Sequence, residues 1–280
     1  MKKVVGFIGL CKNVGKTTFL NKYIKEKEKY LITSIGWDGE AIDHIFGIKK
    51  PSIFVKEGSF VCTYSNLKPT KSEKISELPI ENQFLGKLEI YRMKENDIVQ
   101  VAGPSSITQL KTFLKFAENL EISEIIIDGA ADRRITLSVS NEIFYICGPT
   151  YSQNEQKLIR TIIGIIEMFN IPIIEPNQQF IEIKSINKTN INTLDENQKY
   201  VIEDFSKIVI DYELIPKVLK KYKIFVKKKP EKLNIVINSF NADLMKHTLN
   251  TSKIKEEVGR LISNTHALEI IDLTASNSLP

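Results

Sequence analysis

The chain has 280 residues, of which 42% are hydrophobic and 26% are charged, and its formal net charge is +5. These values are typical of a globular protein, and 13 glycines and 10 prolines are too few for a fibrous or disordered chain. A chain of this length can bury one large core, so we expect a single domain over residues 1–280.

Nothing in the composition predicts secretion or a membrane span. The cysteines are few, far apart and without the paired spacing of a zinc site, which favours reduced thiols and a cytoplasmic location: they are Cys11, Cys62 and Cys147. The basic and apolar start of the chain continues into a loop of lysine and glycine, where a signal peptide would have a small-residue cleavage site. The apolar stretch 158–174 contains Arg160 and Glu167 and is shorter than the roughly 20 residues of a membrane helix.

The first elements alternate between strand and helix. The apolar run "VVGFIGL" (4–10) predicts a buried strand, and a helix is predicted from Lys16 through "TTFLNKYIKEKEK". A second buried strand, "YLITSIG" (30–36), ends at the polar cluster Trp37-Asp38-Gly39-Glu40. We therefore expect a strand, loop, helix and strand unit.

The pattern changes between residues 51 and 102. Short alternating pieces there are separated by Gly, Pro, Lys and Asn, and we interpret them as strands, some of them in hairpins. The pieces are "SIFVKEG", "FVCTYS", "KLEIYRM" and "DIVQVAG". This strand-rich segment is predicted to be an antiparallel insertion or an extension of the sheet.

The alternation returns after this segment. Helices are predicted over 107–120 and 156–169, with a fully apolar strand ending at Asp128 and another at 142–150. Residues 177–198 are polar and rich in Asn, which favours a loop, and late strands are expected at "KIVIDY", "LNIVINSF" and "ALEIIDL". The predicted fold class is α/β, a doubly wound and mainly parallel sheet with helices on both faces and an antiparallel insertion.

The stretch "GLCKNVGKTT" (9–18) resembles a phosphate-binding P-loop, although Leu10 stands where the first glycine of the pattern is expected. The chemistry of such a loop lies mainly in its second half. There, backbone N–H groups surround a phosphate, Lys16 reaches the β and γ oxygens, and the hydroxyl of Thr17 ligates Mg²⁺. We predict a nucleotide and magnesium site on seven residues: Lys12, Asn13, Val14, Gly15, Lys16, Thr17 and Thr18. The alternative is a structural turn between strand and helix.

Two aspartates follow predicted strands. Asp128 ends "IIIDGA", the arrangement in which a P-loop protein holds its metal, and the alternative is a simple strand-end aspartate. Asp38 follows the second strand and is a candidate to orient the attacking water or the metal, whereas an ordinary turn aspartate is the alternative. Arg133 and Arg134, next to Asp132, either contact phosphate or a partner, or form a salt-bridged loop.

Residues 217–232 contain eight lysines but no arginine, so a solvated face is favoured over a nucleic-acid surface, and we do not expect a nucleic-acid partner. Asn187-Lys188 lacks the surroundings of a guanine-recognition motif. ATP is therefore the expected nucleotide.

The strings "GLCKNVGKTTFLN", "LITSIGWDGEAID", "KPSIFVKEGSFVCT", "VAGPSS" and "IIIDGAADRR", in this order, resemble the P-loop subunit of the reactivase of lysine 5,6-aminomutase. The similarity covers about residues 4–150. It implies a P-loop NTPase that works with a second ATPase subunit to replace damaged cobalamin in an adenosylcobalamin-dependent aminomutase. It also implies phosphate binding by residues 15–18, with Asp38 and Asp128 as the acidic positions.

Composition and spacing alone leave three functions open. The first is an NTPase that converts hydrolysis into conformational work on a partner protein. The second is a small-molecule kinase or ATP-dependent ligase, in which residues 51–102 would form the acceptor pocket. The third is a nucleotide-binding subunit without turnover.

Overall fold

The computed structural model describes residues 2–36, 53–129, 134–241, 246–261 and 268–273. The chain forms two compact units. The first unit contains Met1–Gly9 and Gly15–Ser140, and the second contains Leu10–Val14 and Asn141–Ser278. The loop after the first strand thus contributes residues to both units, and the prediction of one domain stays a prediction.

The first unit is built on a mixed sheet. Its strands, in spatial order, are β1 (Lys3–Gly9), β8 (Glu124–Asp128), β2 (Tyr30–Ser34), β4 (Phe60–Tyr64), β6 (Gly86–Met93) and β5 (Ser72–Asn82). The pairs β1–β8, β8–β2 and β2–β4 are parallel, while β4–β6 and β6–β5 are antiparallel. The parallel strands β1, β8 and β2 are almost continuously apolar and buried, because both of their faces are covered.

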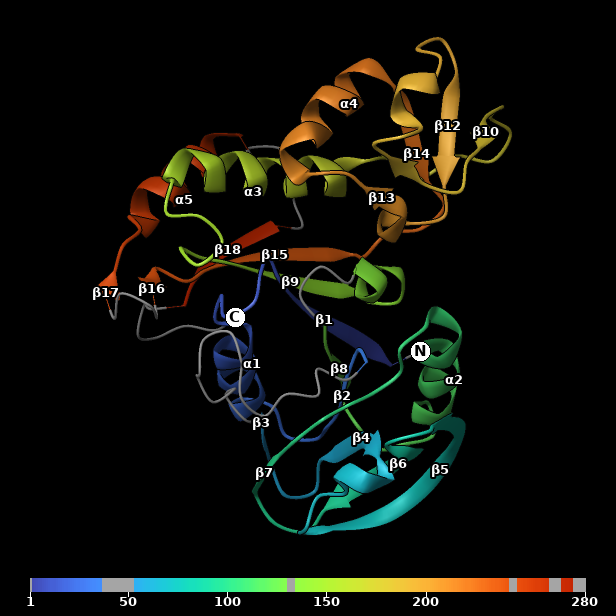
Figure 1. Ribbon diagram of the computed structural model, residues 1–280, viewed down its shortest axis with the longest axis vertical. Coiled ribbons are helices and arrows are strands. Elements are labelled where there is room, and N and C mark those ends of the chain that lie inside the picture. Colours follow the sequence, from blue (N-terminus) through green and yellow to red (C-terminus); the bar gives the residue numbers. More distant parts are fainter. Residues whose placement is uncertain (1, 37–52, 130–133, 242–245, 262–267, 274–280) are drawn as a thin grey trace. The chain divides into compact units, whose positions relative to one another are not determined.

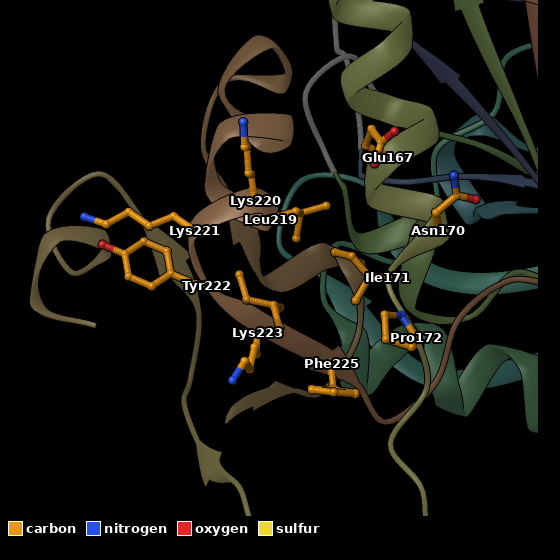
Figure 2. Close-up of a pocket in the computed structure, with 11 residues that line it drawn as sticks. Glu167, Asn170, Ile171, Pro172, Leu219, Lys220, Lys221, Tyr222, Lys223 and Phe225 are labelled. Atoms are coloured by element: carbon orange, nitrogen blue, oxygen red, sulfur yellow. The ribbon is translucent and has the colours of Figure 1, made fainter. Parts of the chain in front are cut away.

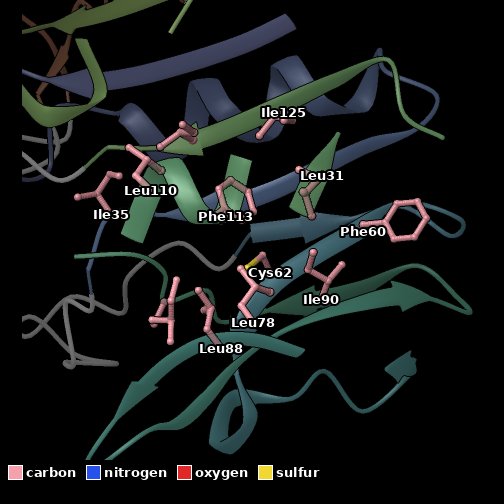
Figure 3. Packing of buried hydrophobic residues seen from close by; sticks show 14 of the residues in the cluster. Leu31, Ile35, Phe60, Cys62, Leu78, Leu88, Ile90, Leu110, Phe113 and Ile125 are labelled. Carbon is pink, nitrogen blue, oxygen red and sulfur yellow. The ribbon is translucent and has the colours of Figure 1, made fainter. Parts of the chain in front are cut away.

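Among the described residues of the first unit, two α-helices accompany the sheet, together with an antiparallel pair of short strands, β3 (Ile53–Val55) and β7 (Asp97–Val99). Helix α1 (Lys16–Lys25) buries an apolar face, and α2 (Ile107–Ala117) packs against β5. The side chain of Ser106 caps α2 by accepting a hydrogen bond from the backbone N–H of Gln109. Figure 3 shows how Phe113 of α2 lies among buried residues of the strands, including Leu31 and Ile125.

The second unit has its own parallel strands, β9 (Glu142–Cys147), β15 (Lys232–Ile237) and β18 (Leu268–Asp272), with β15 paired to both of the others. Helix α3 (Glu155–Asn170) runs alongside β15 and β9 (Figure 1) and contacts α5 (Thr251–Leu261).

The second unit also contains smaller elements. Strands β10 (Ile181–Glu182), β12 (Lys199–Ile202) and β14 (Lys223–Val226) form a parallel sheet. Helix α4 (Ile215–Lys221) contacts both α3 and β14. Two further pairs are a parallel one, β11 (Ile186–Asn187) with β13 (Ile208–Val209), and an antiparallel one, β16 (Phe240–Asn241) with β17 (Lys246–His247).

The predicted mixed α/β architecture with a mostly parallel sheet is confirmed, and the antiparallel pairs of the first unit fall within residues 51–102 as expected. The prediction of a loop over 177–198 is wrong in part, because β10 and β11 lie there. Strands β5, β12, β14 and β17 and helices α4 and α5 were not predicted. In the described part of the chain, no helix combines the length and apolar character that crossing a bilayer requires.

Candidate functional site

In the first unit, three strands end at one edge of the sheet. Asp128, the last residue of β8, is the register partner of Phe7 in β1 and of Ser34 in β2. The pairing continues past the strand ends, since the backbone N–H of Gly129 donates to the carbonyl of Phe7 at 2.9 Å and that of Ile35 donates to the carbonyl of Asp128 at 3.1 Å. Because these strands are parallel, their carboxyl ends bring polar residues together.

Gly129 keeps this edge closely packed. A Cβ atom at this position would lie 2.5 Å from the carbonyl oxygen of Phe7, which is a backbone atom and cannot move aside. Any side chain there would push β8 away from β1. The glycine after Asp128 therefore fixes where the carboxylate lies relative to the end of β1.

Helix α1 begins at the same edge with an unusual start. Gly15 occupies the cap position with φ 98°, in the left-handed region that glycine adopts without strain. No side chain caps the helix, and its first turn has no acidic residue. The backbone N–H groups at the start of a helix have no partner within the helix, so this end favours an anion.

Lys16, the first residue of α1, makes an ion pair with Asp128 through its Nζ and the Oδ1 of the carboxylate. The two side chains are 17% and 14% exposed, so the pair is shielded on most sides but still reached by solvent. The structure thus brings together the two residues that were predicted to hold phosphate and metal. Thr17 follows on α1 and is half-buried, and Thr18 is exposed.

The preceding residues of the loop, Leu10–Val14, are held within the second unit. The backbone N–H of Leu10 donates to the carbonyl of Ile146 in β9 at 3.1 Å, and the Leu10 side chain is only 6% exposed. Leu10 has no positive φ, so glycine is not required where the P-loop pattern has one. Asn13 has the positive φ instead, 60°, and both Asn13 and Lys12 are exposed.

Two residues that sequence reasoning missed hold this part of the loop. The Asn238 side chain, 8% exposed, donates from Nδ2 to the carbonyl of Val14 at 3.0 Å and accepts from the backbone N–H of Phe240 at 3.1 Å. The hydroxyl of Thr150 donates to the carbonyl of Asn13 at 3.4 Å. Asn238 follows β15 directly, and its position after a buried parallel strand was the signal that could have drawn attention to it.

The segment "VAGPSS" (101–106) lies beside the end of β2 in the first unit. The backbone N–H of Gly36 donates to the carbonyl of Pro104 at 2.9 Å, and the N–H of Gly103 donates to the carbonyl of Gly36 at 3.1 Å. The hydroxyl of Thr63 accepts from the N–H of Ala102 at 3.1 Å. Backbone hydrogen bonds thus connect the start of α2 to the strand edge that contains Asp128.

The described residues do not include all of the predicted ones. Asp38, Asp132 and Arg133 fall outside the described residues, and Arg134 opens a short 3-10 turn, Arg134–Ser138. The discounted Asn187-Lys188 pair lies in the second unit, where Asn187 accepts hydrogen bonds from the backbone of the following turn and Lys188 pairs with Asp211 at 2.9 Å.

Comparisons with known proteins find no match to the chain, neither among protein-family models nor among curated proteins.

Proposed function

We propose that the chain binds MgATP at the edge formed by β1, β8 and α1, as a P-loop NTPase with a doubly wound fold. The observation that carries the proposal is the ion pair between Lys16 and Asp128 at the uncapped start of α1. A lysine, free backbone donors and a strand-end carboxylate are the groups that bind a nucleotide phosphate and its metal. A structural turn would not need all three at one edge.

Magnesium is the metal that fits these residues. Among the described residues, no three or more His, Cys, Asp or Glu side chains are grouped closely enough to hold a metal ion by themselves. Mg²⁺ does not need such a group, because it keeps several waters and binds through substrate phosphates and one or two protein oxygens. Thr17 and Asp128 offer those oxygens, and the metal would supply positive charge that stabilises the leaving phosphate.

Lys16 has to change partner when the nucleotide binds. The lysine ammonium neutralises Asp128 in the structure, and β and γ phosphate oxygens carry more charge than one carboxylate. Transfer of Lys16 to the phosphates would leave Asp128 available to waters of the metal. The residues therefore support coupled binding, in which phosphate binding and metal binding depend on each other.

The purpose that we propose for the hydrolysis rests on the resemblance described above. The chain would act in the cytoplasm with a second ATPase subunit to reactivate an adenosylcobalamin-dependent aminomutase, such as lysine 5,6-aminomutase. Asp38 would then orient the attacking water, and Lys12 and Asn13 would contribute to the phosphate-binding loop.

Isothermal titration calorimetry with MgATP tests the nucleotide site. We expect the parent protein to bind and Lys16→Ala to lose at least about 100-fold in affinity, because a charge-assisted contact to two phosphates is removed. Lys25→Ala is the matched control, since Lys25 is an exposed lysine in the last turn of the same helix. Equal affinity in the parent and in Lys16→Ala would refute the site.

A further inference from the structure

A groove in the second unit lies between the end of α3, helix α4 and the start of β14. Its volume is about 370 Å³, which is near the lower end of the range for ligand sites. Ile171, Pro172, Leu219 and Phe225 give it an apolar floor, and Figure 2 shows Leu219 pointing toward Ile171. A floor of this kind suits one or two aliphatic side chains.

The lysines of residues 217–232 fall into two groups. Five of the eight are already bound within the unit, four to carboxylates and one to backbone carbonyls: Lys221 to Glu196, Lys227 to Glu182, Lys228 to Glu203, Lys232 to Glu269, and Lys229 to the carbonyls of Phe169 and Ile171. The other three are exposed and make no ion pair with any described residue: Lys217, Lys220 and Lys223.

Two of these three unneutralised lysines line the groove. Lys220 and Lys223 extend in opposite directions beside the apolar floor, as Figure 2 shows. Glu167, the one acidic lining residue, lies across the groove on α3. The α4 and β14 side therefore attracts negative charge, whereas the α3 side repels it.

The aromatic residues of the groove argue against nucleic acid as the occupant. Single-stranded nucleic acid binds largely by stacking its bases on aromatic faces. Here the Nζ of Lys221 lies 5.0 Å from the centroid of the Tyr222 ring, Tyr222 is buried, and the Nζ of Lys199 lies 6.0 Å from the centroid of the Phe225 ring. A face of each ring is thus occupied by a cation of the same chain.

We propose that this groove docks an acidic segment of a partner protein. An aliphatic side chain of the segment fills the floor between Ile171 and Leu219, and carboxylates on either side of it pair with Lys220 and Lys223. Opposite charges at the rim select the partner and speed its association, while the apolar contact slows its release. The inference does not depend on the nucleotide site, because every residue that it uses lies in the second unit.

Fluorescence anisotropy with a labelled peptide tests the proposal. The probe has two leucines between two pairs of glutamates. One comparison peptide has glutamines for the glutamates, a second has alanines for the leucines, and the third probe is an oligothymidylate of about the same length. We expect the acidic leucine peptide to bind most tightly. Methyl NMR of the full chain should show shifts at Ile171 and Leu219.

The double variant Lys220→Glu, Lys223→Glu should weaken the binding by about 10-fold or more, because two attractive pairs become repulsive. Lys217→Glu is the matched control, since Lys217 is also an exposed, unpaired lysine of α4 but does not line the groove. It should change the affinity by less than about twofold.

Circular dichroism establishes that both variants are folded. Four outcomes would overturn the proposal: no binding of the acidic leucine peptide at millimolar concentration, equal binding of the glutamine or alanine peptide, equal losses in the double variant and in Lys217→Glu, or tighter binding of the oligothymidylate.

Discussion

The ammonium of Lys16 and the carboxylate of Asp128 are in direct contact, although 112 residues separate them in the chain. The contact exists because β1 and β8 are parallel neighbours in register, so that α1 begins beside the end of β8. In the proposed function, the nucleotide phosphates approach the same ammonium. The phosphates then have to compete with Asp128 for Lys16.

Because of this competition, Asp128→Asn should raise the affinity for ATP in the absence of metal and lower the rate of hydrolysis in its presence. In EDTA, the variant should bind ATP about three- to tenfold more tightly, because Lys16 is no longer neutralised and a negative charge near the phosphates is gone. With Mg²⁺, turnover should fall about 100-fold, because metal placement is lost. Calorimetry and a phosphate-release assay measure the two effects.

Asp211→Asn is the control for Asp128→Asn, since it makes the same change of side chain in an exposed ion pair with Lys188 of the second unit and should leave both measurements unchanged. A loss of ATP affinity in EDTA for Asp128→Asn would contradict the competition between Asp128 and phosphate.

Thr17→Ala should mainly change the response to magnesium. The hydroxyl is the metal ligand in the proposed site, whereas the backbone N–H of residue 17 remains available to phosphate. We expect the Mg²⁺ concentration for half-maximal phosphate release to rise about 10-fold in Thr17→Ala. In Thr17→Ser, which keeps the hydroxyl, this concentration should stay near that of the parent. A normal magnesium response in Thr17→Ala would show that its hydroxyl does not ligate the metal.

Asn238 is expected to position the phosphate-binding loop. Its side chain is the donor to the carbonyl of Val14, and without it this buried loop segment loses a hydrogen bond. Asn238→Ala and Asn238→Asp should both weaken ATP binding by about 5- to 10-fold, since neither side chain can donate to Val14. Calorimetry measures the affinity, and the melting temperature separates this effect from a general loss of stability.

Asn170→Ala, an exposed asparagine of the same unit, is the control for Asn238 and should bind ATP normally. If the Asn238 variants melt at a lower temperature but keep their ATP affinity, Asn238 stabilises the unit without positioning the loop.

Much of the fold could be predicted from the sequence because its buried strands are apolar runs. Strand β5 could not, since it is the outer strand of its sheet and its sequence, "SEKISELPIEN", is mostly polar, contains a proline and pairs with β6 through register shifts. Helix α4 has only seven residues, and three of them are lysines, so too few apolar residues remain to show a helical pattern in the sequence. Neither segment has the hydrophobic period that identifies an element.

Some residues of the candidate site could be predicted from the sequence, and others could not. Gly15, Lys16, Thr17 and Asp128 belong to local motifs, so the sequence identifies them without knowledge of the fold. The contact of Asn238 with Val14 spans 224 residues and depends on which parallel strands are neighbours. No local pattern specifies that order of strands. The sequence therefore identifies the residues proposed to bind phosphate and metal, whereas the residue that holds their loop depends on the order of the strands.

Alkylation of the cysteines gives a test of the loop that does not depend on turnover. Cys62 and Cys147 are fully buried, and burial raises the pKa of both thiols, so they should not react with iodoacetamide in the folded protein. Cys11 is only half-buried, in the proposed phosphate-binding loop. Mass spectrometry should find modification at Cys11 alone, and MgATP should slow it. Equal rates with and without MgATP would argue against nucleotide at this loop.

In the proposed function, hydrolysis drives the reactivation of a partner enzyme. The isolated chain should release phosphate slowly, and a cobalamin-inactivated aminomutase with the second ATPase subunit should raise the rate by about 10-fold or more, because an NTPase that does conformational work must not discharge without its load. The assay combines these proteins with fresh adenosylcobalamin and MgATP, and measures recovered mutase activity and phosphate release together. Lys16→Ala should restore no activity. Phosphorylation of a small metabolite by this chain alone, without recovery of the mutase, would instead identify a kinase or ligase, and tight ATP binding without turnover in any mixture would identify a binding subunit.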